Sequence, residues 1–290
     1  MPVLARSATG EFVPNLDAYH FQLLDDGVRQ RVTGEYTKNQ SIALVILMQT
    51  GGAGLRQFQS YMSLPVLVPS IVGDSPHEIM FVTFDSRIEE IWHFPVRSDG
   101  VDYALTHPHA GDKGAAIIDA VKFGVDQLQQ EPGNFRRIIL LLSQSRDSGS
   151  KTSPESAIRV LGEGSTTVYS LTFPSPKPKR KRNIKRNRKR VNGSPSPLAA
   201  AARAMRMNTA GEIAFLTGGE QFRFSGMPDF NSMLLNVRTD IRNRYLLTFQ
   251  PTSHKAGFHT LTVRIGGANS HIHVTSRAGY WFETGNSTTE

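Results

Sequence analysis

The chain of 290 residues contains no cysteine. Disulfide bonds, thiolate metal sites, iron–sulfur clusters and cysteine nucleophiles are therefore excluded. The absence does not fix the compartment, because a reducing cytosol and a cysteine-poor cell envelope are both compatible with it. Hydrophobic residues make up 39% of the chain and charged residues 20%, which is enough to bury the core of one large domain, with or without a small companion.

Long apolar runs are also missing. No stretch approaches the roughly 18 apolar residues that a membrane-spanning helix needs. The first residues, MPVLARSATGEFVPNL, lack the charged-then-apolar order of a signal peptide. As written, the sequence predicts a cytoplasmic protein without a transmembrane segment.

The positive charge of the chain is concentrated in one segment. The formal net charge is +8, and residues 177–190, KPKRKRNIKRNRKR, hold ten of the 33 basic residues and no acidic one. The rest of the chain has 23 basic and 25 acidic residues and is close to neutral. The high isoelectric point is therefore a weak argument that the folded body binds nucleic acid.

Buried strands and helical patterns alternate through most of the chain. Nearly continuous apolar runs are typical of strands that are covered on both faces of a parallel sheet. The predicted buried strands are 41–48, 78–84, 137–143 and 166–173, with an edge strand at 87–94; helices are expected up to residue 71 and at 114–130, 153–161, 198–217 and 228–242. This alternation predicts an α/β fold with a doubly wound, mostly parallel, Rossmann-like sheet of about six strands between two helix layers.

Short strands are expected at both ends of the chain, namely at 2–6, 21–24, 28–33, 245–250, 259–265 and 271–276. We expect them to form a small β-rich extension. The predicted organisation is an α/β domain at 38–243 with a disordered basic insertion at 174–197, a β-rich flanking module made of 1–37 and 244–282, and a tail at 283–290. The Pro, Ser, Lys and Arg content of the insertion is typical of a solvated loop.

Several segments together suggest a family. They are GEFVPNLDAYHFQLLDDGVRQRV, IALVILMQTGGAG, EIMFVTFDSRIEEIWHF, FRRIILLLSQSRDSGS, LTGGEQF, RNRYLLTFQPTSHKAGFHTLTVRI and RAGYW. In this order and spacing the chain resembles the von Willebrand factor type A (VWA)-related proteins that are abundant in Acidobacteria, over nearly its whole length. The resemblance implies a bacterial VWA domain that binds a protein or matrix partner, and an exported or cell-envelope location.

Type A domains usually bind a divalent cation at the carboxyl edge of the sheet. Their ligands are an Asp-x-Ser-x-Ser motif, a Thr before the long helix, and an Asp after the next strand. By the resemblance, the corresponding positions in this chain are Gln49, Gly51, Ala53, Ala115 and Gln144. Mg²⁺ prefers oxygen ligands that include carboxylates, and none remains at these positions. We therefore expect a degenerate adhesion site with no metal and no cofactor, although Asp147, Asp112 and Thr50 could rebuild one.

The same edge is the expected site of partner binding, because open α/β sheets bind ligands beyond the carboxyl ends of their strands. The predicted partner-binding rim consists of Gln49, Thr50, Gly51, Gly52, Gln144, Ser145 and Arg146. The partner and the oligomeric state are not indicated by the sequence.

Other candidate sites are weaker. The Gly51–Gly54 turn lacks the third glycine of a dinucleotide fingerprint, with Gln57 in its place, so a nucleotide-handling enzyme is the weakest alternative. The pairs His107/His109 and His271/His273 have no evident third zinc ligand. Asp85 and the Glu89–Glu90 pair fit a solvated sheet edge better than acid–base catalysis. The sequence predicts a binding module and no enzyme.

The basic run has two interpretations, and the sequence favours neither. It is an electrostatic arm for an anionic polymer such as nucleic acid or acidic lipid, or a solvated loop without a dedicated partner. The run contains no aromatic residue, which argues against base stacking. The candidate anion-binding residues are Lys177, Lys179, Arg180, Lys181, Arg182, Lys185, Arg186, Arg188, Lys189 and Arg190.

Overall fold

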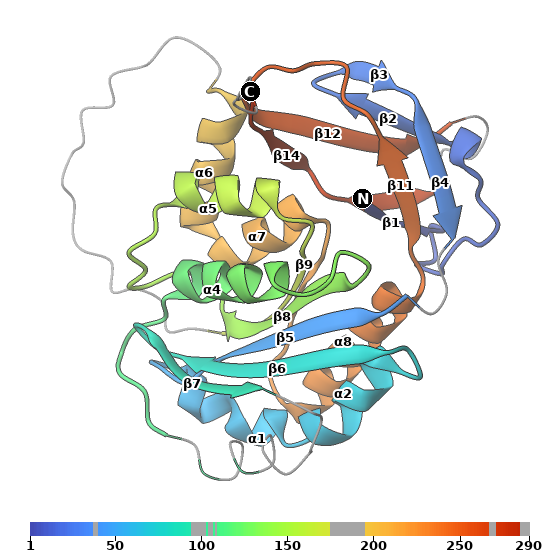
Figure 1. Cartoon of the computed structure of the whole chain (residues 1–290). Coiled ribbons are helices and arrows are strands. Elements are labelled where there is room, and N and C mark those ends of the chain that lie inside the picture. Colours follow the sequence, from blue (N-terminus) through green and yellow to red (C-terminus); the bar gives the residue numbers. More distant parts are fainter. Residues whose placement is uncertain are drawn as a thin grey trace.

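The computed structural model describes residues 1–36, 40–93, 103, 107, 109–174, 195–266 and 271–284. Its largest sheet consists of β5 (Ile42–Gln49), β6 (His77–Phe84), β7 (Ile88–His93), β8 (Arg136–Gln144), β9 (Thr167–Phe173) and β10 (Gln221–Arg223). The strand order is β10-β9-β8-β5-β6-β7, and only the edge strand β7 runs antiparallel to its neighbour (Figure 1). A mixed α/β fold with a mostly parallel, Rossmann-like six-stranded sheet is therefore confirmed.

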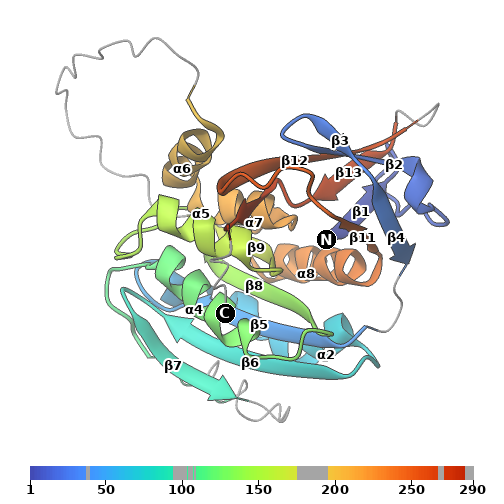
Figure 2. The ribbon, with the colours of Figure 1, turned by 45° about the horizontal axis from the view of Figure 1, so that its top comes forward.

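Helices cover both faces of this sheet (Figures 1 and 2). In β5, Leu44 and Ile46 join the core beneath the first helix layer, whereas Val45 and Leu47 join the core beneath the second, because side chains alternate along a strand. No helix in the described part of the chain is long and apolar enough to cross a bilayer. The first layer contains η2 (Gly54–Gln57), α1 (Phe58–Tyr61), α2 (Leu64–Val72) and α8 (Met227–Arg242), and the second contains α4 (Ile117–Gln129), α5 (Pro154–Glu163), α6 (Pro197–Met207) and α7 (Thr209–Thr217).

The helix expected at 198–217 is two helices, so that expectation was wrong. Asn208 lies outside the helical conformation, with φ −149° and ψ 82°, and it ends α6. Its side chain then accepts a hydrogen bond from Gly211 N at 3.3 Å and caps α7. Asparagine favours such a cap because its side chain replaces the missing backbone partner of a helix start.

The terminal strands form two further sheets beside the helical layers (Figure 1). Their orders are β13-β1-β11-β4 and β14-β12-β2-β3. Val3, Phe21, Leu23, Tyr245 and Leu247 are part of the apolar cluster that these sheets share. The elements are β1 (Pro2–Arg6), η1 (Ala18–His20), β2 (Phe21–Asp25), β3 (Val28–Gln30), β4 (Val32–Tyr36), β11 (Tyr245–Phe249), β12 (Gly257–Ile265), β13 (His273–Ser276) and β14 (Gly279–Phe282).

The strand expected at 28–33 is divided between these sheets. Its first part, β3, pairs with β2, whereas the part after Arg31 belongs to β4 and pairs with β11. Strands β10 and β14 were not anticipated as strands. β10 has only three residues, and β14 follows β13 after only two residues. Neither is long enough to show the alternation on which a sequence-based assignment depends.

The β-rich sheets contact the α/β part through α5 and β14. Arg277 donates hydrogen bonds to the carbonyl oxygens of Leu161, Gly162 and Gly164, at 2.9 to 3.1 Å. These carbonyls lie at the carboxyl end of α5, where a helix leaves its last oxygens unpaired. At Gly162 a Cβ atom would lie 2.7 Å from Trp281 N, so only glycine allows this approach. The guanidinium group of Arg277 therefore ties the β-rich sheets to the carboxyl end of α5.

Candidate functional site

At the carboxyl edge of the large sheet, a buried amide joins two strand ends. Gln49 is fully buried at the end of β5. Its Nε2 donates to Gly51 O at 2.8 Å, and its Oε1 accepts from Gln144 N at 2.9 Å. A carboxylate could accept the second bond but could not donate the first unless it were protonated. The amide therefore suits this position, and it bridges the loops that follow β5 and β8.

The loop before α4 closes tightly over the loop that follows β5. Gly52 N donates to Asp112 O at 2.7 Å. A Cβ atom at Gly51 would lie 2.2 Å from Gly114 O and 2.8 Å from Asp85 Cβ. With this backbone, a serine side chain has no room at position 51. The other two small residues at candidate metal positions, Ala53 and Ala115, are also buried.

Asp85 lies inside this edge of the molecule. The expectation that it belongs to a solvated edge was wrong, because Asp85 is only 3% exposed. Its Oδ1 accepts from Arg87 N at 3.0 Å, and its Oδ2 accepts from Asp112 N at 2.8 Å. A buried carboxylate is stabilised by such bonds. Asp85 therefore joins the end of β6 to the loop before α4.

Glu89 shares this environment and faces the rim. Its Oε2 lies 2.7 Å from Thr50 Oγ1, which donates the hydrogen bond. Burial, followed by the neighbouring charges of Asp85 and Glu90, raises the pKa of Glu89, while the Thr50 bond opposes the change. Asp85, Glu89 and Glu90 together would attract a cation, but a metal site also needs ligand atoms that converge on a single point.

The remaining acidic groups at this edge bond to the backbone. Asp112 Oδ1 accepts from Gly114 N at 2.6 Å and from Ser86 N at 3.2 Å. Asp147 Oδ1 accepts from Ile118 N at 3.1 Å, at the start of α4. Within the described ranges, no three Asp, Glu or His side chains at this edge bring ligand atoms close enough together to hold one ion. Asp112, Asp147 and Thr50 therefore act as loop and helix supports in this conformation.

The expected partner-binding rim is only partly accessible. Gln49, Thr50 and Gly51 are buried, Gln144 and Ser145 are half-buried, and Gly52 and Arg146 are exposed. The Nε of Arg146 donates to Met207 O at 2.9 Å, and the Met207 side chain is 61% exposed. The accessible part of the rim thus combines a cation with a neighbouring apolar side chain.

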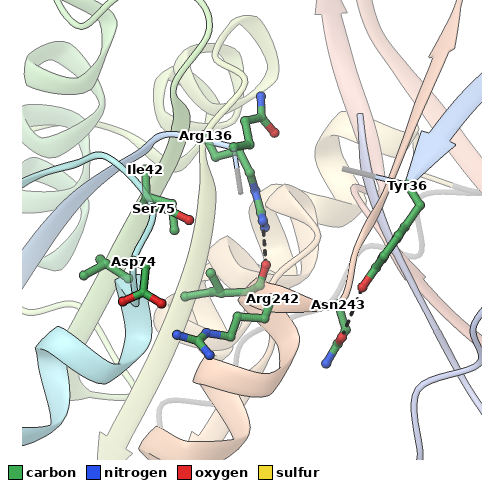
Figure 3. Close-up of a pocket in the computed structure, with 10 residues that line it drawn as sticks. Tyr36, Ile42, Asp74, Ser75, Arg136, Arg242 and Asn243 are labelled. Carbon is green, nitrogen blue, oxygen red and sulfur yellow. Dashed lines mark hydrogen bonds between the residues drawn. The ribbon is translucent and has the colours of Figure 1, made fainter. Parts of the chain in front are cut away.

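The opposite, amino-terminal edge of the sheet is hollowed. A pocket of about 290 Å³ lies between the starts of β5 and β8, the loop before β6 and the end of α8. Figure 3 shows the residues that line it. Within it, Arg136 Nη1 donates to Ile241 O at 2.6 Å. Burial, together with the nearby charge of Arg244, lowers the pKa of Arg136 to about 10 against the opposing effect of Tyr169.

A second pocket of about 390 Å³ adjoins the first and shares Arg136 with it. Arg244 and Arg277 also line this pocket, and none of its lining residues is acidic. Burial lowers the pKa of Arg277 to about 10. Thr166 adds a buried hydroxyl without a hydrogen-bond partner. Chemically, such a pocket favours an anion over a cation.

The four histidines of the two candidate pairs lie at the surface. His271 and His273 are both exposed. His107 and His109 are exposed as well, and His109 Nε2 lies 3.6 Å from Glu90 Oε1. The basic run at 177–190 lies outside the described residues.

No family model and no curated protein matches the chain. Among solved structures, it is similar to the pilus adhesin SpaC from Lactobacillus rhamnosus GG, with 9% identity and a TM-score of 0.50, over 93% of this chain and 44% of the adhesin. It is also similar to an aerotolerance-related membrane protein from Bacteroides fragilis, with 15% identity and a TM-score of 0.42, over 69% of this chain and 98% of that protein. The similarity to the protein BatB from Bacteroides thetaiotaomicron covers 69% of this chain and 97% of BatB, with 14% identity and a TM-score of 0.41. The chain spans less than half of the adhesin, and at these identities the similarity concerns the fold alone.

Proposed function

We propose that this chain is a non-enzymatic binding module with a von Willebrand factor type A-like fold, a degenerate metal-ion-dependent adhesion site, and a protein or matrix partner. The observation that carries the proposal is the amide bridge of Gln49. Its two hydrogen bonds, to Gly51 O and from Gln144 N, use both ends of the side chain at the position where a type A domain has a carboxylate. A neutral, buried amide whose oxygen already accepts a hydrogen bond offers a dication no charge and a poorly available oxygen.

Recognition then depends on groups other than a metal ion. The exposed part of the rim offers Gly52 and Arg146, with the exposed side chain of Met207 beside Arg146. Arginine binds carboxylates and carbonyl oxygens through several donors, and it is enriched at protein interfaces together with methionine. A partner surface that presents a carboxylate next to apolar side chains fits this rim.

The loss of the metal site is tested by titrating the native chain with Mg²⁺ in a calorimeter. We expect no binding. The matched variants are Gln49→Asp/Gln144→Asp, which restores two carboxylates, and Gln49→Asn/Gln144→Asn, which shortens the same side chains without charge. Mg²⁺ should raise the melting temperature of the Asp variant only. Restoring a serine at Gly51 is left out, because its Cβ would meet Gly114 O. Micromolar Mg²⁺ affinity in the native chain would overturn the proposal.

Metal-independent recognition is tested with a photo-crosslinking amino acid at position 146. In a second variant, the photo-crosslinking amino acid replaces Arg264, an exposed residue of β12. With extracts of the source cells, we expect an adduct at position 146. Unlabelled native chain should compete with its formation, the Arg146→Ala chain should compete poorly, and EDTA should not reduce it. Loss of the adduct in EDTA would instead support metal-bridged adhesion, and adducts at position 264 alone would place the binding surface on the β-rich sheets.

A second function, binding of an anionic polymer, is favoured by one observation. Ten of the 14 residues at 177–190 are basic, and the rest of the chain is close to neutral. Such a run attracts phosphate or carboxylate polymers through charge alone.

A further inference from the structure

The turn between β2 and β3 brings two acidic side chains next to a buried histidine. Asp25 ends β2, Asp26 follows it with a left-handed backbone (φ 47°), and His259 lies on the neighbouring strand β12. Ligand atoms of these three residues lie within 4.8 Å of one another. In the sequence, Asp25 and Asp26 lie between the strands expected at 21–24 and 28–33, and His259 begins the strand expected at 259–265.

Each of these side chains is held by its other polar atom. His259 Nε2 lies 2.6 Å from the carbonyl oxygen of Lys255. Asp25 Oδ2 accepts from the hydroxyl of Tyr280 at 2.9 Å. Asp26 Oδ1 accepts from the backbone and the hydroxyl of Thr260, at 2.8 and 2.9 Å. Metal-binding histidines and carboxylates are usually oriented by such bonds on the side away from the ion.

The atoms on the inner side are left unsatisfied. Asp25 and His259 are 2% and 3% exposed, yet Asp25 Oδ1 and His259 Nδ1 have no hydrogen-bond partner. His259 Nδ1 lies 3.7 Å from Asp25 Oδ1 and 2.8 Å from Asp26 Oδ2. A buried polar atom without a partner is costly, so a positive charge shared by Asp25 Oδ1 and His259 Nδ1 with the neighbouring Asp26 Oδ2 would stabilise this cluster.

The protonation of His259 follows from its neighbours. A carbonyl oxygen can only accept, so Nε2 carries a proton and donates a hydrogen bond to the carbonyl oxygen of Lys255. In the neutral ring Nδ1 then presents a lone pair to two carboxylates, whose oxygens also present lone pairs. These atoms repel one another unless Nδ1 also carries a proton or a metal cation lies between them.

We infer that Asp25 Oδ1, Asp26 Oδ2 and His259 Nδ1 form a binding site for one divalent transition-metal ion such as Zn²⁺ or Mn²⁺. Two carboxylates balance the charge of a dication, and an imidazole nitrogen favours Zn²⁺ over Mg²⁺ or Ca²⁺. Two ligand atoms about 2.1 Å from one ion lie about 3.0–3.4 Å apart, and the observed separations of 2.8 and 3.7 Å fall on either side of this range. The ion fastens the β2–β3 turn to β12.

Water can reach this site from one side. The Asp26 side chain is 48% exposed, whereas those of Asp25 and His259 are buried. An ion can therefore enter beside Asp26 and keep water as its remaining ligands. Stacking of the His259 ring on Tyr280, with centroids 5.1 Å apart, holds the imidazole in place.

The test uses the full chain after treatment with EDTA and dialysis. Zn²⁺ is titrated calorimetrically, and Co²⁺ is added separately because its visible spectrum reports the type and number of ligands. We expect one ion per chain. Asp26→Asn and His259→Gln should each weaken binding at least tenfold, and Tyr280→Phe, which frees Asp25, about 10- to 100-fold. The matched control is His271→Gln/His273→Gln, which removes two exposed histidines and should leave the affinity unchanged.

Three results would overturn the inference: no Zn²⁺ binding by the native chain, unchanged binding in both Asp26→Asn and His259→Gln, or loss of binding in the control. The first result would leave His259 as an imidazolium ion paired with the two carboxylates. Asp26→Asn retains the oxygen that Thr260 bonds, so it tests the site even if His259→Gln does not fold. Repeating the Mg²⁺ titration in Asp26→Asn separates this site from the sheet edge.

Discussion

Gln49 Oε1 accepts a hydrogen bond from Gln144 N at 2.9 Å, and this bond joins the carboxyl ends of two adjacent core strands. The same amide donates to Gly51 O at 2.8 Å. One neutral side chain thus joins two backbone segments at the edge where α/β sheets usually bind ligands. These two hydrogen bonds hold the end of β8 to the loop that follows β5.

The stability of this edge of the sheet should depend on the charge of the side chain at position 49. In Gln49→Glu, a buried carboxylate faces Gly51 O and loses the donor, so we expect a loss of about 3 kcal/mol at pH 7. Burial raises the pKa of such a group, so the loss should shrink as the pH falls through the raised pKa and the carboxyl group becomes a donor. Gln49→Met, which removes both bonds, should cost about 1–3 kcal/mol at any pH. Urea unfolding at pH 5 and pH 7 measures both, and an equal loss for Gln49→Glu at the two pH values would contradict the expectation.

Gly51 should tolerate no side chain. A Cβ atom there would lie 2.2 Å from Gly114 O, which belongs to the backbone and cannot rotate away. We expect Gly51→Ala to lower the free energy of unfolding by about 2 kcal/mol, as overpacking does. The control is Gly133→Ala, where a Cβ would meet nothing within 4 Å, and a change within about 0.5 kcal/mol is expected. Equal stability of the two variants would show that the loops are not closed at this edge.

The sequence predicts the large sheet well because its strands carry their own signal. β5 is apolar at nearly every position, which is typical of a strand covered on both faces, and the structure buries all eight of its residues. Asn208 was harder to interpret, because an asparagine inside an amphipathic pattern is compatible with either a continuous helix or a cap. The difference depends on tertiary contacts, which the local pattern does not contain.

The sites were less predictable, because they combine residues that are distant in the sequence. His259 and Asp26 are 233 positions apart, and strand pairing alone brings them together. Asp85 follows a buried strand, as many solvated turn residues do, and only the closing loop around Asp112 buries it. A useful signal was present at Asp25–Asp26, since two adjacent carboxylates before Gly27 exceed what a hairpin turn requires.

Arg277 should be essential to the contact between the β-rich sheets and α5. Its guanidinium group bonds to the carbonyls of Leu161, Gly162 and Gly164 at once. The ammonium group of Arg277→Lys cannot reproduce this planar arrangement, so we expect a loss of about 2 kcal/mol in urea unfolding. Arg264→Lys, at an exposed position of β12, is the matched control and should have no effect. If both variants unfold at the same urea concentration, the contact does not depend on the guanidinium group.

Asp119 should make stability dependent on pH in the acid range. Its carboxylate accepts from Lys151 N at 2.8 Å and from Thr152 N at 2.9 Å. Although burial opposes the change, a hydrogen bond from the Thr152 side chain, together with these backbone bonds and the charge of Lys151, lowers the pKa of Asp119 below its usual value of 3.8. A lowered pKa means that the stabilisation is present above pH 4 and is lost as the pH falls through the folded value. Asp119→Asn should therefore cost about 0.5–1 kcal/mol at pH 7 and less at pH 3. A cost that stays constant across this range in thermal unfolding would refute the assignment.

The basic run should decide whether the chain binds anionic polymers at all. Replacing its ten Lys and Arg residues by Gln at constant length changes the formal net charge from +8 to −2. If the run is an electrostatic arm, the native chain should bind duplex DNA or anionic vesicles with an affinity that falls steeply with salt, and the neutralised run should abolish that binding. The slope of log affinity against log salt counts the neutralised phosphates, at about 0.9 for each contact with DNA. Fluorescence anisotropy at several salt concentrations gives the slope. Weak binding with a flat slope in both proteins would identify the run as a solvated loop, and recognition would then depend on the folded surfaces alone.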